Sequence, residues 1–243
     1  MPRHSYTYKA LNSLVGKAIH RYGMIDDGDR IAVGLSGGKD SMTLLWALAE
    51  RCKRVPVDYE LFPIYVDPGF PGSFADELAD ACHQMGFDLS IDITDHGPVA
   101  HSDENRENPC FLCARLRRKR LFQIADSLGC SKLALGHNKD DVIETLFLNI
   151  CYAGEISTMV PRQEFFKGRF TVIRPMCMVD ENSIRRFSRS QGFPRFTNPC
   201  PSAGKTKRAE IKTMLERLYR TNRKIKGNIY RAMSHVKLEY LLK

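Results

Sequence analysis

The sequence lacks any long apolar run. No stretch approaches the roughly 18 uncharged residues that a helix needs to cross a bilayer. The polar opening MPRHSYTYKALNSL has no apolar segment of the kind found in secretory signals. Internal repeats and low-complexity tracts are also missing. We therefore expect no membrane contact and a cytoplasmic location.

The composition is that of an ordinary globular protein. With 243 residues, 43% of them hydrophobic, the chain has enough apolar surface to bury a full core in one large domain, with or without an appendage. It has eight cysteines but no export signal, and reducing compartments do not maintain disulfides. We therefore expect reduced thiols or metal ligands.

Positive charge is concentrated in the C-terminal tail. From Lys205 onward there are 12 basic and 3 acidic residues, whereas the rest of the chain has 25 of each. A basic segment of this kind is typical of a protein that binds a phosphate backbone, although a solvated helix face has the same composition. The residues expected to meet phosphates are Lys205, Lys207, Arg208, Lys212, Arg217, Arg220, Arg223, Lys224 and Lys226.

Apolar runs alternate with helical patterns along most of the chain. Strands are expected at residues 30–35, 60–67, 88–94, 132–136 and 170–175, with helices before, between and after them. Continuous apolar strands that alternate with helices indicate an α/β fold with a doubly wound parallel sheet. We expect an α/β domain over residues 1–192, and a Cys-Pro loop with a basic helical extension over residues 193–243.

The segment SGGKDS, Ser36 to Ser41, lies between the first of these strands and a helix. In a parallel sheet, ligands bind at the carboxyl ends of the strands, and a glycine-rich turn there presents backbone N–H groups and a helix N-terminus to phosphate. The segment fits neither the Walker A pattern nor the Gly-x-Gly-x-x-Gly pattern of dinucleotide binders. A simple tight turn is the alternative, but the order of strand, glycines, hydroxyls and helix favours an anion site.

SGGKDS resembles the PP-loop of the N-type ATP pyrophosphatases, which use ATP as an adenylating agent. Three other segments, DPGFPG, PCFLC and GHNKDD, follow in the order seen in the tRNA 2-thiolation enzymes of that superfamily. The chain is most similar to the tRNA 2-thiocytidine synthetases (the TtcA family). It has no cysteine before Cys52 or after Cys200, so it lacks the Cys-rich termini of the 2-thiouridine relatives.

The resemblance implies an adenine nucleotide alpha hydrolase-like fold and a tRNA sulfurtransferase. ATP would adenylate the C2 carbonyl oxygen of a base, pyrophosphate would leave, and sulfur would then displace AMP. The implied cofactors are ATP, Mg²⁺ and a [4Fe-4S] cluster. The implied partners are tRNA, a sulfur donor (sulfide or a persulfide-carrying cysteine desulfurase) and, as an option, a second copy of the chain in a homodimer.

The nucleotide site is expected at the carboxyl ends of three strands. Asp40 and Asp141 carry hard oxygen ligands of the kind that Mg²⁺ prefers, although Asp140 and Asp141 also suit a helix N-terminus. Lys39 has a compact charge suited to phosphate. By the resemblance, the residues that bind nucleotide are Leu35, Ser36, Gly37, Gly38, Lys39, Asp40, Ser41, Val66, Asp67, Gly136 and His137.

Cys110 and Cys113 have the two-residue gap seen in many iron–sulfur sites. The third ligand implied by the resemblance is Cys200, in the stiff loop Asn-Pro-Cys-Pro, and Arg117 lies one helical turn after Cys113. We expect most of the other cysteines to be buried free thiols.

Three alternatives remain for the cysteine pair and for the chain as a whole. The pair has the spacing of half a zinc site, as in a non-enzymatic RNA-binding module, and also the spacing of a redox pair. The third alternative is a cluster-free PP-loop ligase of the lysidine type, in which an amine attacks the adenylate. The cysteine pair of PCFLC has no role in the chemistry of such a ligase. An intact PP-loop argues against a non-enzymatic module.

Overall fold

The computed structural model describes residues 6–204 and 206–242. Lys205, one of the predicted phosphate contacts, lies outside these ranges. Within them, no helix combines the length and the apolar character needed to cross a membrane.

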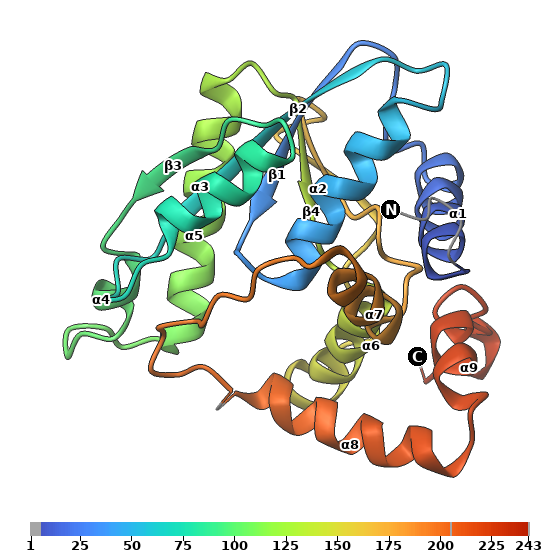
Figure 1. The fold of residues 1–243 in the computed structure, drawn as a ribbon. Helices are drawn as coiled ribbons and strands as arrows, with labels where there is room; N and C mark the ends of the chain where they lie inside the picture. The colour runs from blue at the N-terminus through green and yellow to red at the C-terminus, as the bar shows by residue number, and fades with distance from the viewer. Residues whose placement is uncertain (1–5, 205, 243) are drawn as a thin grey trace. The chain divides into compact units, whose positions relative to one another are not determined.

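The strands form one six-stranded sheet in the order β3-β2-β1-β4-β6-β5 (Figure 1). All neighbouring pairs are parallel except β5 with β6, so the predicted parallel sheet is confirmed with one added edge strand. The strands are β1 (Asp29–Leu35), β2 (Tyr59–Asp67), β3 (Ser90–Ile93), β4 (Lys132–Leu135), β5 (Arg162–Phe165) and β6 (Phe170–Ile173).

The helices follow the predicted periodicity, except for α4, α9, η1 and η2, for which no periodicity was predicted. The α-helices are α1 (Tyr6–Arg21), α2 (Lys39–Cys52), α3 (Ala75–Gln84), α4 (His96–Ala100), α5 (Pro109–Ser127), α6 (Lys139–Leu148), α7 (Glu181–Gln191), α8 (Lys207–Thr221) and α9 (Ile225–Ala232). A π-helix, η1 (Asn149–Ala153), continues α6, and a 3₁₀ turn, η2 (Leu238–Tyr240), lies near the C-terminus.

Helices cover both faces of the sheet. Trp46 of α2 contacts Tyr8 of α1 and Phe187 of α7, with ring centroids 5.4 and 4.5 Å apart, so these three helices pack together. Leu121 and Ala125 of α5 belong to a different apolar cluster, which they form with buried side chains of β1, β2, β4 and β6. The doubly wound arrangement is therefore confirmed.

The chain forms two compact units. The first consists of residues 6–138 and 161–203 and contains the whole sheet; the second consists of residues 139–160, 204 and 206–242 and contains α6, η1, α8, α9 and η2. The second unit has its own small apolar core, formed by Ile143 of α6 with Ile211 and Leu215 of α8. The domain boundary that the sequence predicts between residues 192 and 193 stays a prediction.

Candidate active site

The SGGKDS loop lies at the carboxyl end of β1, the strand between β2 and β4. The chain leaves β1 for β2 on one side and returns as β4 on the other, so this is the point at which open α/β sheets bind ligands. Helix α2 begins at Lys39, and its N-cap is Gly38 in an extended conformation. Because Gly38 has no side chain, the positive end of α2 is open to an anion.

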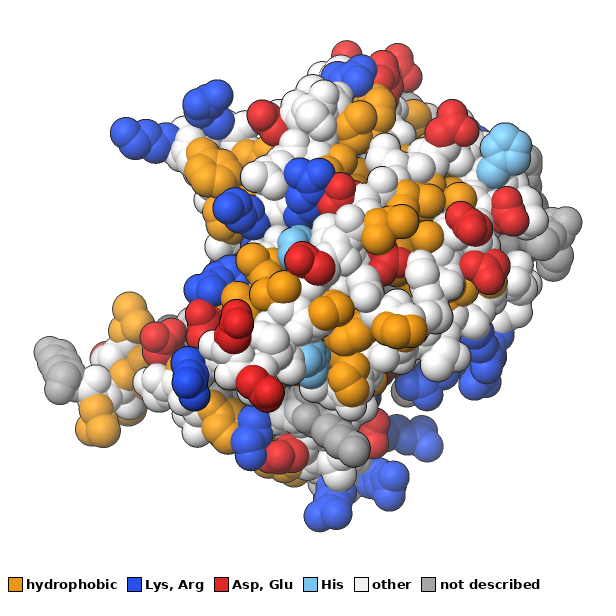
Figure 2. Space-filling model, turned by 90° about the vertical axis from the view of Figure 1, so that its left-hand side faces the viewer, with side chains coloured by type: hydrophobic (Ala, Val, Ile, Leu, Met, Phe, Trp, Pro, Cys, Tyr) orange, Lys and Arg blue, Asp and Glu red, His pale blue; other side chains and the backbone are white. Residues whose placement is uncertain are grey.

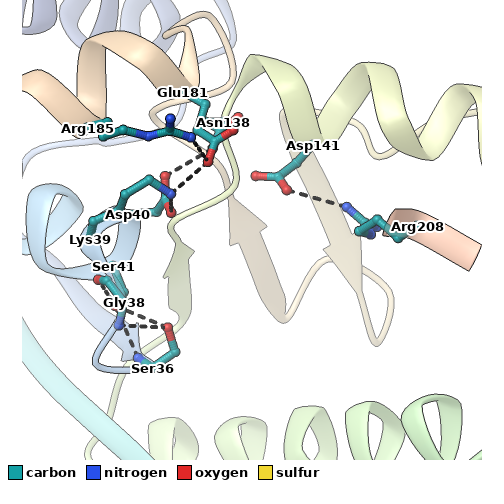
Figure 3. Close-up of polar contacts among 10 residues, drawn as sticks. All are labelled: Ser36, Gly38, Lys39, Asp40, Ser41, Asn138, Asp141, Glu181, Arg185 and Arg208. Atoms are coloured by element: carbon teal, nitrogen blue, oxygen red, sulfur yellow. Dashed lines mark hydrogen bonds and ion pairs between the residues drawn. The ribbon is translucent and has the colours of Figure 1, made fainter. Parts of the chain in front are cut away.

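Hydrogen bonds within the loop fix its shape (Figure 3). The Ser36 N–H donates to Ser41 Oγ at 3.1 Å, and Ser41 Oγ lies 3.0 Å from the Gly38 carbonyl, to which it donates. The Gly38 N–H donates to Ser36 Oγ at 3.4 Å. Gly37 has φ +70°, and a Cβ there would lie 2.5 Å from the ring of Phe74. The loop therefore requires glycine at this position.

The end of β4 lies against the start of α2. A Cβ on Gly136 would lie 3.0 Å from the backbone nitrogen of Ser41 and 3.1 Å from the carbonyl carbon of Asp40. Only a glycine permits this close approach of two backbones. Gly136 and the PP-loop therefore belong to one surface, as predicted from the motif GHNKDD.

The two charged residues of the loop are held by their neighbours (Figure 3). Lys39 Nζ lies 2.7 Å from Asp40 and 3.0 Å from Glu181, the first residue of α7. The amide of Asn138 donates to the other oxygen of Asp40 at 3.0 Å. Burial by itself lowers the pKa of Lys39, but the Asp40 and Glu181 carboxylates outweigh it, so the pKa of Lys39 is raised and the ammonium stays charged.

The end of β2 holds the loop DPGFPG. Val66 and Asp67 are both 2% exposed. Asp67 accepts hydrogen bonds from the Gly69 N–H at 2.8 Å and from the hydroxyl of Ser73, and its carbonyl accepts one from Thr94 at 2.7 Å. The Asp67 carboxylate therefore organises this edge of the sheet.

The three predicted cluster ligands lie near one another in the first unit. Asn108 caps α5 by accepting the Cys110 N–H at 3.0 Å, which places Cys110 in the first turn and Cys113 one turn later. Burial raises the pKa of the Cys113 thiol; Arg117 opposes this, and nearby Cys200 and Cys110 add to it. Within residues 6–204 and 206–242, no three His, Cys, Asp or Glu side chains are gathered closely enough to hold a metal ion. Cys110 and Cys200 are therefore close enough to Cys113 to affect its pKa, but the three side chains are not gathered around one point.

Arg117 is the basic residue of α5 that faces this region. It lowers the pKa of Cys113 and also acts on the hydroxyl of Tyr65, whose pKa is raised mainly by burial. Two neighbours are occupied elsewhere: Arg115 pairs with Glu107 at 2.8 Å, and Arg120 pairs with Asp92 at 2.7 Å. Only part of the α5 basic cluster is therefore open to a ligand.

The other cysteines are all free thiols. Cys82, Cys130 and Cys177 are buried, and burial raises the pKa of Cys82 and of Cys130 to about 11. Cys52 is half-buried and Cys151 is exposed. Full burial therefore distinguishes Cys82, Cys130 and Cys177 from the three predicted cluster ligands, which are exposed or half-buried.

The second unit contains Asp141 and the basic tail. Asp141 lies in the first turn of α6, where Arg208 of α8 is 3.4 Å away, and Lys226 of α9 is 2.5 Å from Asp140. Arg208 and Lys226 therefore stabilise the second unit. Four other basic residues are exposed and form no ion pair with another described residue: Arg217, Arg220, Arg223 and Lys224.

Basic side chains occur in more than one place on the surface. On the face in Figure 2, Lys and Arg side chains form several groups, with acidic and hydrophobic side chains between them. Lys207 is exposed but paired with Glu210 at 3.2 Å. The exposed basic residues that remain for phosphate are therefore a subset of the predicted ones.

Sequence reasoning missed several residues of the site. Asn138 lies within GHNKDD, so the motif itself could have pointed to it. Glu181 is far from the loop in the sequence and had no such signal. Phe196, in the loop before Cys200, stacks on Phe74 with ring centroids 4.7 Å apart, and both rings lie against Gly37. This contact joins the cysteine loop to the PP-loop.

Comparison with known proteins agrees with this geometry. The PP-loop domain family matches residues 7–218. Over 97% of this chain, the tRNA-cytidine(32) 2-sulfurtransferases of Geobacter sulfurreducens and Geotalea daltonii are 41% and 42% identical, with 93% and 94% of those proteins covered. The U34-tRNA thiolase NcsA from Methanococcus maripaludis, solved with its [4Fe-4S] cluster, is 26% identical with a TM-score of 0.77, over 97% of this chain and 80% of that one. The chain therefore belongs to the PP-loop family, in the group of the tRNA-cytidine(32) 2-sulfurtransferases.

Proposed function

We propose that this protein is an ATP-dependent tRNA sulfurtransferase that converts a cytidine, position 32 by similarity to its relatives, to 2-thiocytidine. One observation carries the proposal. A PP-loop at the switch point of the sheet and three cysteines with no disulfide, Cys110, Cys113 and Cys200, occur in the same compact unit. An adenylation site and a thiol trio together are what thiolation of a carbonyl carbon requires.

The first half of the reaction is adenylation. The C2 carbonyl oxygen of the base attacks the α-phosphate of ATP, and pyrophosphate leaves. The backbone N–H groups of the PP-loop and the N-terminus of α2 bind phosphate oxygens, and Lys39 adds a fixed positive charge. The Asp40 and Asp141 carboxylates are the Mg²⁺ ligands that we infer, because Mg²⁺ takes hard oxygen ligands. Positioning and electrostatics supply the rate enhancement.

The second half replaces the activated oxygen with sulfur, and AMP leaves. Cys110, Cys113 and Cys200 would supply three thiolates, which are the ligands that iron–sulfur clusters take, and the archaeal thiolase was solved with a [4Fe-4S] cluster. With three thiolates, a bound [4Fe-4S] cluster would have one iron open to carry the incoming sulfide. Sulfide itself and a persulfide-carrying cysteine desulfurase are the two sulfur donors that we consider, in a cytoplasmic enzyme that acts alone or as a homodimer.

The test uses anaerobically purified protein with reconstituted iron and sulfide. The protein is incubated with a tRNA transcript that has a cytidine at position 32, together with ATP, Mg²⁺ and sulfide. We expect 2-thiocytidine in the nuclease digest by mass spectrometry, with AMP and pyrophosphate formed in equal amounts. Release of ADP and phosphate would contradict the adenylation step. In a parallel reaction with lysine in place of sulfide, an amine adduct of the cytidine would indicate a ligase of the lysidine type.

A further inference from the structure

The loop that contains Cys200 is built around a turn. The Cys200 carbonyl accepts the N–H of Ala203 at 3.0 Å, so Pro201 and Ser202 are the central residues of the turn. The N–H of Cys200 donates to the side chain of Asn198, also at 3.0 Å. These two hydrogen bonds lie within the loop and do not attach it to the rest of the protein. The position of Cys200 therefore depends on the contacts that Ser202 makes outside the loop.

Ser202 is held by His101. The Nε2 atom of His101 lies 2.7 Å from Ser202 Oγ, and its Nδ1 atom lies 2.9 Å from the carbonyl oxygen of Gly97. A carbonyl only accepts hydrogen bonds, so Nδ1 bears a proton, and Nε2 is hydrogen-bonded to the Ser202 hydroxyl. This contact joins two segments that are 101 residues apart.

The imidazole is itself immobilised. The ring of Phe70 meets it edge-on, with centroids 5.4 Å apart and planes at 74°. Gly97 lies directly against the same phenyl ring, because a Cβ at this position would be 2.6 Å from Phe70 Cζ. His101 is therefore fixed between α4 and the loop that follows β2.

The same chain segment continues into the cysteine pair of α5. Between α4 and α5, the side-chain amide of Asn105 donates to the carbonyls of Ala100 at 2.7 Å and Glu107 at 3.0 Å. These bonds hold the connecting loop in one conformation. The segment 96–113 thus contains two of the three thiols and contacts the loop of the third.

We propose that His101 is a positioning residue, which through Ser202 fixes the Cys200 thiol beside Cys110 and Cys113. The proposal rests on the proposed function, in which the three thiols hold one cluster. His101 contacts neither a thiol nor a substrate in this arrangement. The hydrogen bond of His101 to Ser202 keeps the loop in place, and with it Cys200, the third proposed ligand.

The decisive experiment measures the reactivity of Cys200 in the metal-free full-length chain, so it does not require a cluster. Iodoacetamide labelling of Cys200 is timed by mass spectrometry, with Cys110 as the internal reference. The shorter side chain in His101→Asn keeps an amide near the Gly97 carbonyl but does not reach the Ser202 hydroxyl. The longer side chain in His101→Gln reaches that hydroxyl. We expect labelling of Cys200 about fivefold faster in His101→Asn and in Ser202→Ala, as befits the loss of one hydrogen bond. His101→Gln and the neighbouring control Ser102→Ala should match the wild type.

A second measurement follows iron extraction from the reconstituted proteins by a ferrous chelator. The same two variants should lose iron about fivefold faster. A wild-type protein that binds no iron would contradict the proposed function, yet the labelling rates would still decide the role of His101. Wild-type labelling of Cys200 in both His101→Asn and Ser202→Ala would overturn the proposal. Equal acceleration in His101→Gln would overturn it as well, since the hydrogen bond would then not be the cause.

Discussion

The side-chain amide of Asn138 donates to Asp40 at 3.0 Å, although 98 residues separate the two. Asp40 binds Lys39 through its second oxygen, so the carboxylate is held from two sides. Asn138 is 3% exposed and follows the backbone that approaches α2 at Gly136. The pairing fixes the orientation of the carboxylate that we propose as a Mg²⁺ ligand.

Replacing Asn138 by alanine should therefore weaken the use of Mg²⁺. We expect the Mg²⁺ concentration for half-maximal pyrophosphate release to rise about tenfold, since residues that orient a metal ligand typically contribute that much. Titration of Mg²⁺ at saturating ATP measures the effect. Asn12→Ala, which removes a similar amide that donates to a carbonyl within α1, is the matched control and should leave the titration unchanged. An unchanged titration in Asn138→Ala would remove this residue from the metal site.

The approach of Gly136 to α2 predicts a large effect of one methyl group. Gly136→Ala places a Cβ against the backbone of Asp40 and Ser41, which has no flexible end to move aside. We expect a loss of about 1–3 kcal/mol in the free energy of unfolding, as for other overpacked sites, together with loss of pyrophosphate release.

The matched control for that change is Gly227→Ala. Gly227 lies within α9, and a Cβ there meets nothing within 4 Å. Alanine should stabilise this helix by about 0.5–1 kcal/mol relative to glycine. Chemical unfolding of both variants gives the comparison, and a harmless Gly136→Ala would mean that the two backbones are not in contact in solution.

The sequence was sufficient for most of the sheet because β1, β2, β4 and β6 are continuous apolar runs. It was insufficient for β5 because RQEF alternates between exposed and half-buried positions and has no apolar run. This strand is placed by antiparallel pairing with β6, through a turn in which Phe166 and Lys167 have positive φ. Tertiary pairing of that kind leaves no local signal.

The candidate site also contains some residues with a local sequence signal and others without one. Ser36 to Ser41 and the pair Cys110 and Cys113 lie in local motifs, so a role could be predicted for them from a single segment. The contacts of Glu181 with Lys39 and of His101 with Ser202 arise only when distant segments meet. Their side chains form no local pattern, so a single sequence without the fold cannot indicate them.

Glu144 of α6 gives a prediction about pH. Burial, with a smaller contribution from Asp141, raises the pKa of this carboxyl to about 7, while Arg208 and Lys212 oppose the rise. A pKa that is higher in the folded than in the unfolded state means that the folded protein binds more protons in this window. Its stabilising contribution is therefore fully present below pH 4.5 and is lost as the pH rises through 7.

Glu144→Gln should accordingly be more stable than the wild type at pH 8, by about 1–3 kcal/mol, and the difference should shrink as the pH falls toward 4.5. Urea unfolding across this range measures it. Glu216→Gln, at an exposed position on α8, is the control for the loss of one carboxylate charge. A Glu144→Gln protein that is less stable at pH 8 would mean that the pairing with Arg208 at 3.5 Å outweighs the burial of the charge.

The exposed arginines at the C-terminal end of α8 and just after it predict a salt-dependent tRNA affinity. Neutralising Arg217, Arg220 and Arg223 together should weaken binding and flatten the slope of log affinity against log salt by about one unit per lost phosphate contact. Lys17→Gln, at an exposed position of α1, is the control for a general loss of charge. An unchanged slope in the triple variant would place the tRNA elsewhere.

The thiol trio gives the last prediction. If Cys110, Cys113 and Cys200 hold the cluster, serine at any one of them should remove most of the bound iron under anaerobic reconstitution, because cluster irons are held by thiolates. Cys151→Ser is the matched control, since Cys151 is also an exposed free thiol but lies in the second unit. Buried Cys82 and Cys130, whose pKa values are about 11, should also be replaceable without loss of iron. Iron and sulfide analysis with the visible absorbance spectrum measures all six variants. Zinc in place of iron in the wild type would instead support a structural metal site, and a Cys200→Ser protein that keeps its full cluster and still forms 2-thiocytidine would exclude Cys200 as a ligand.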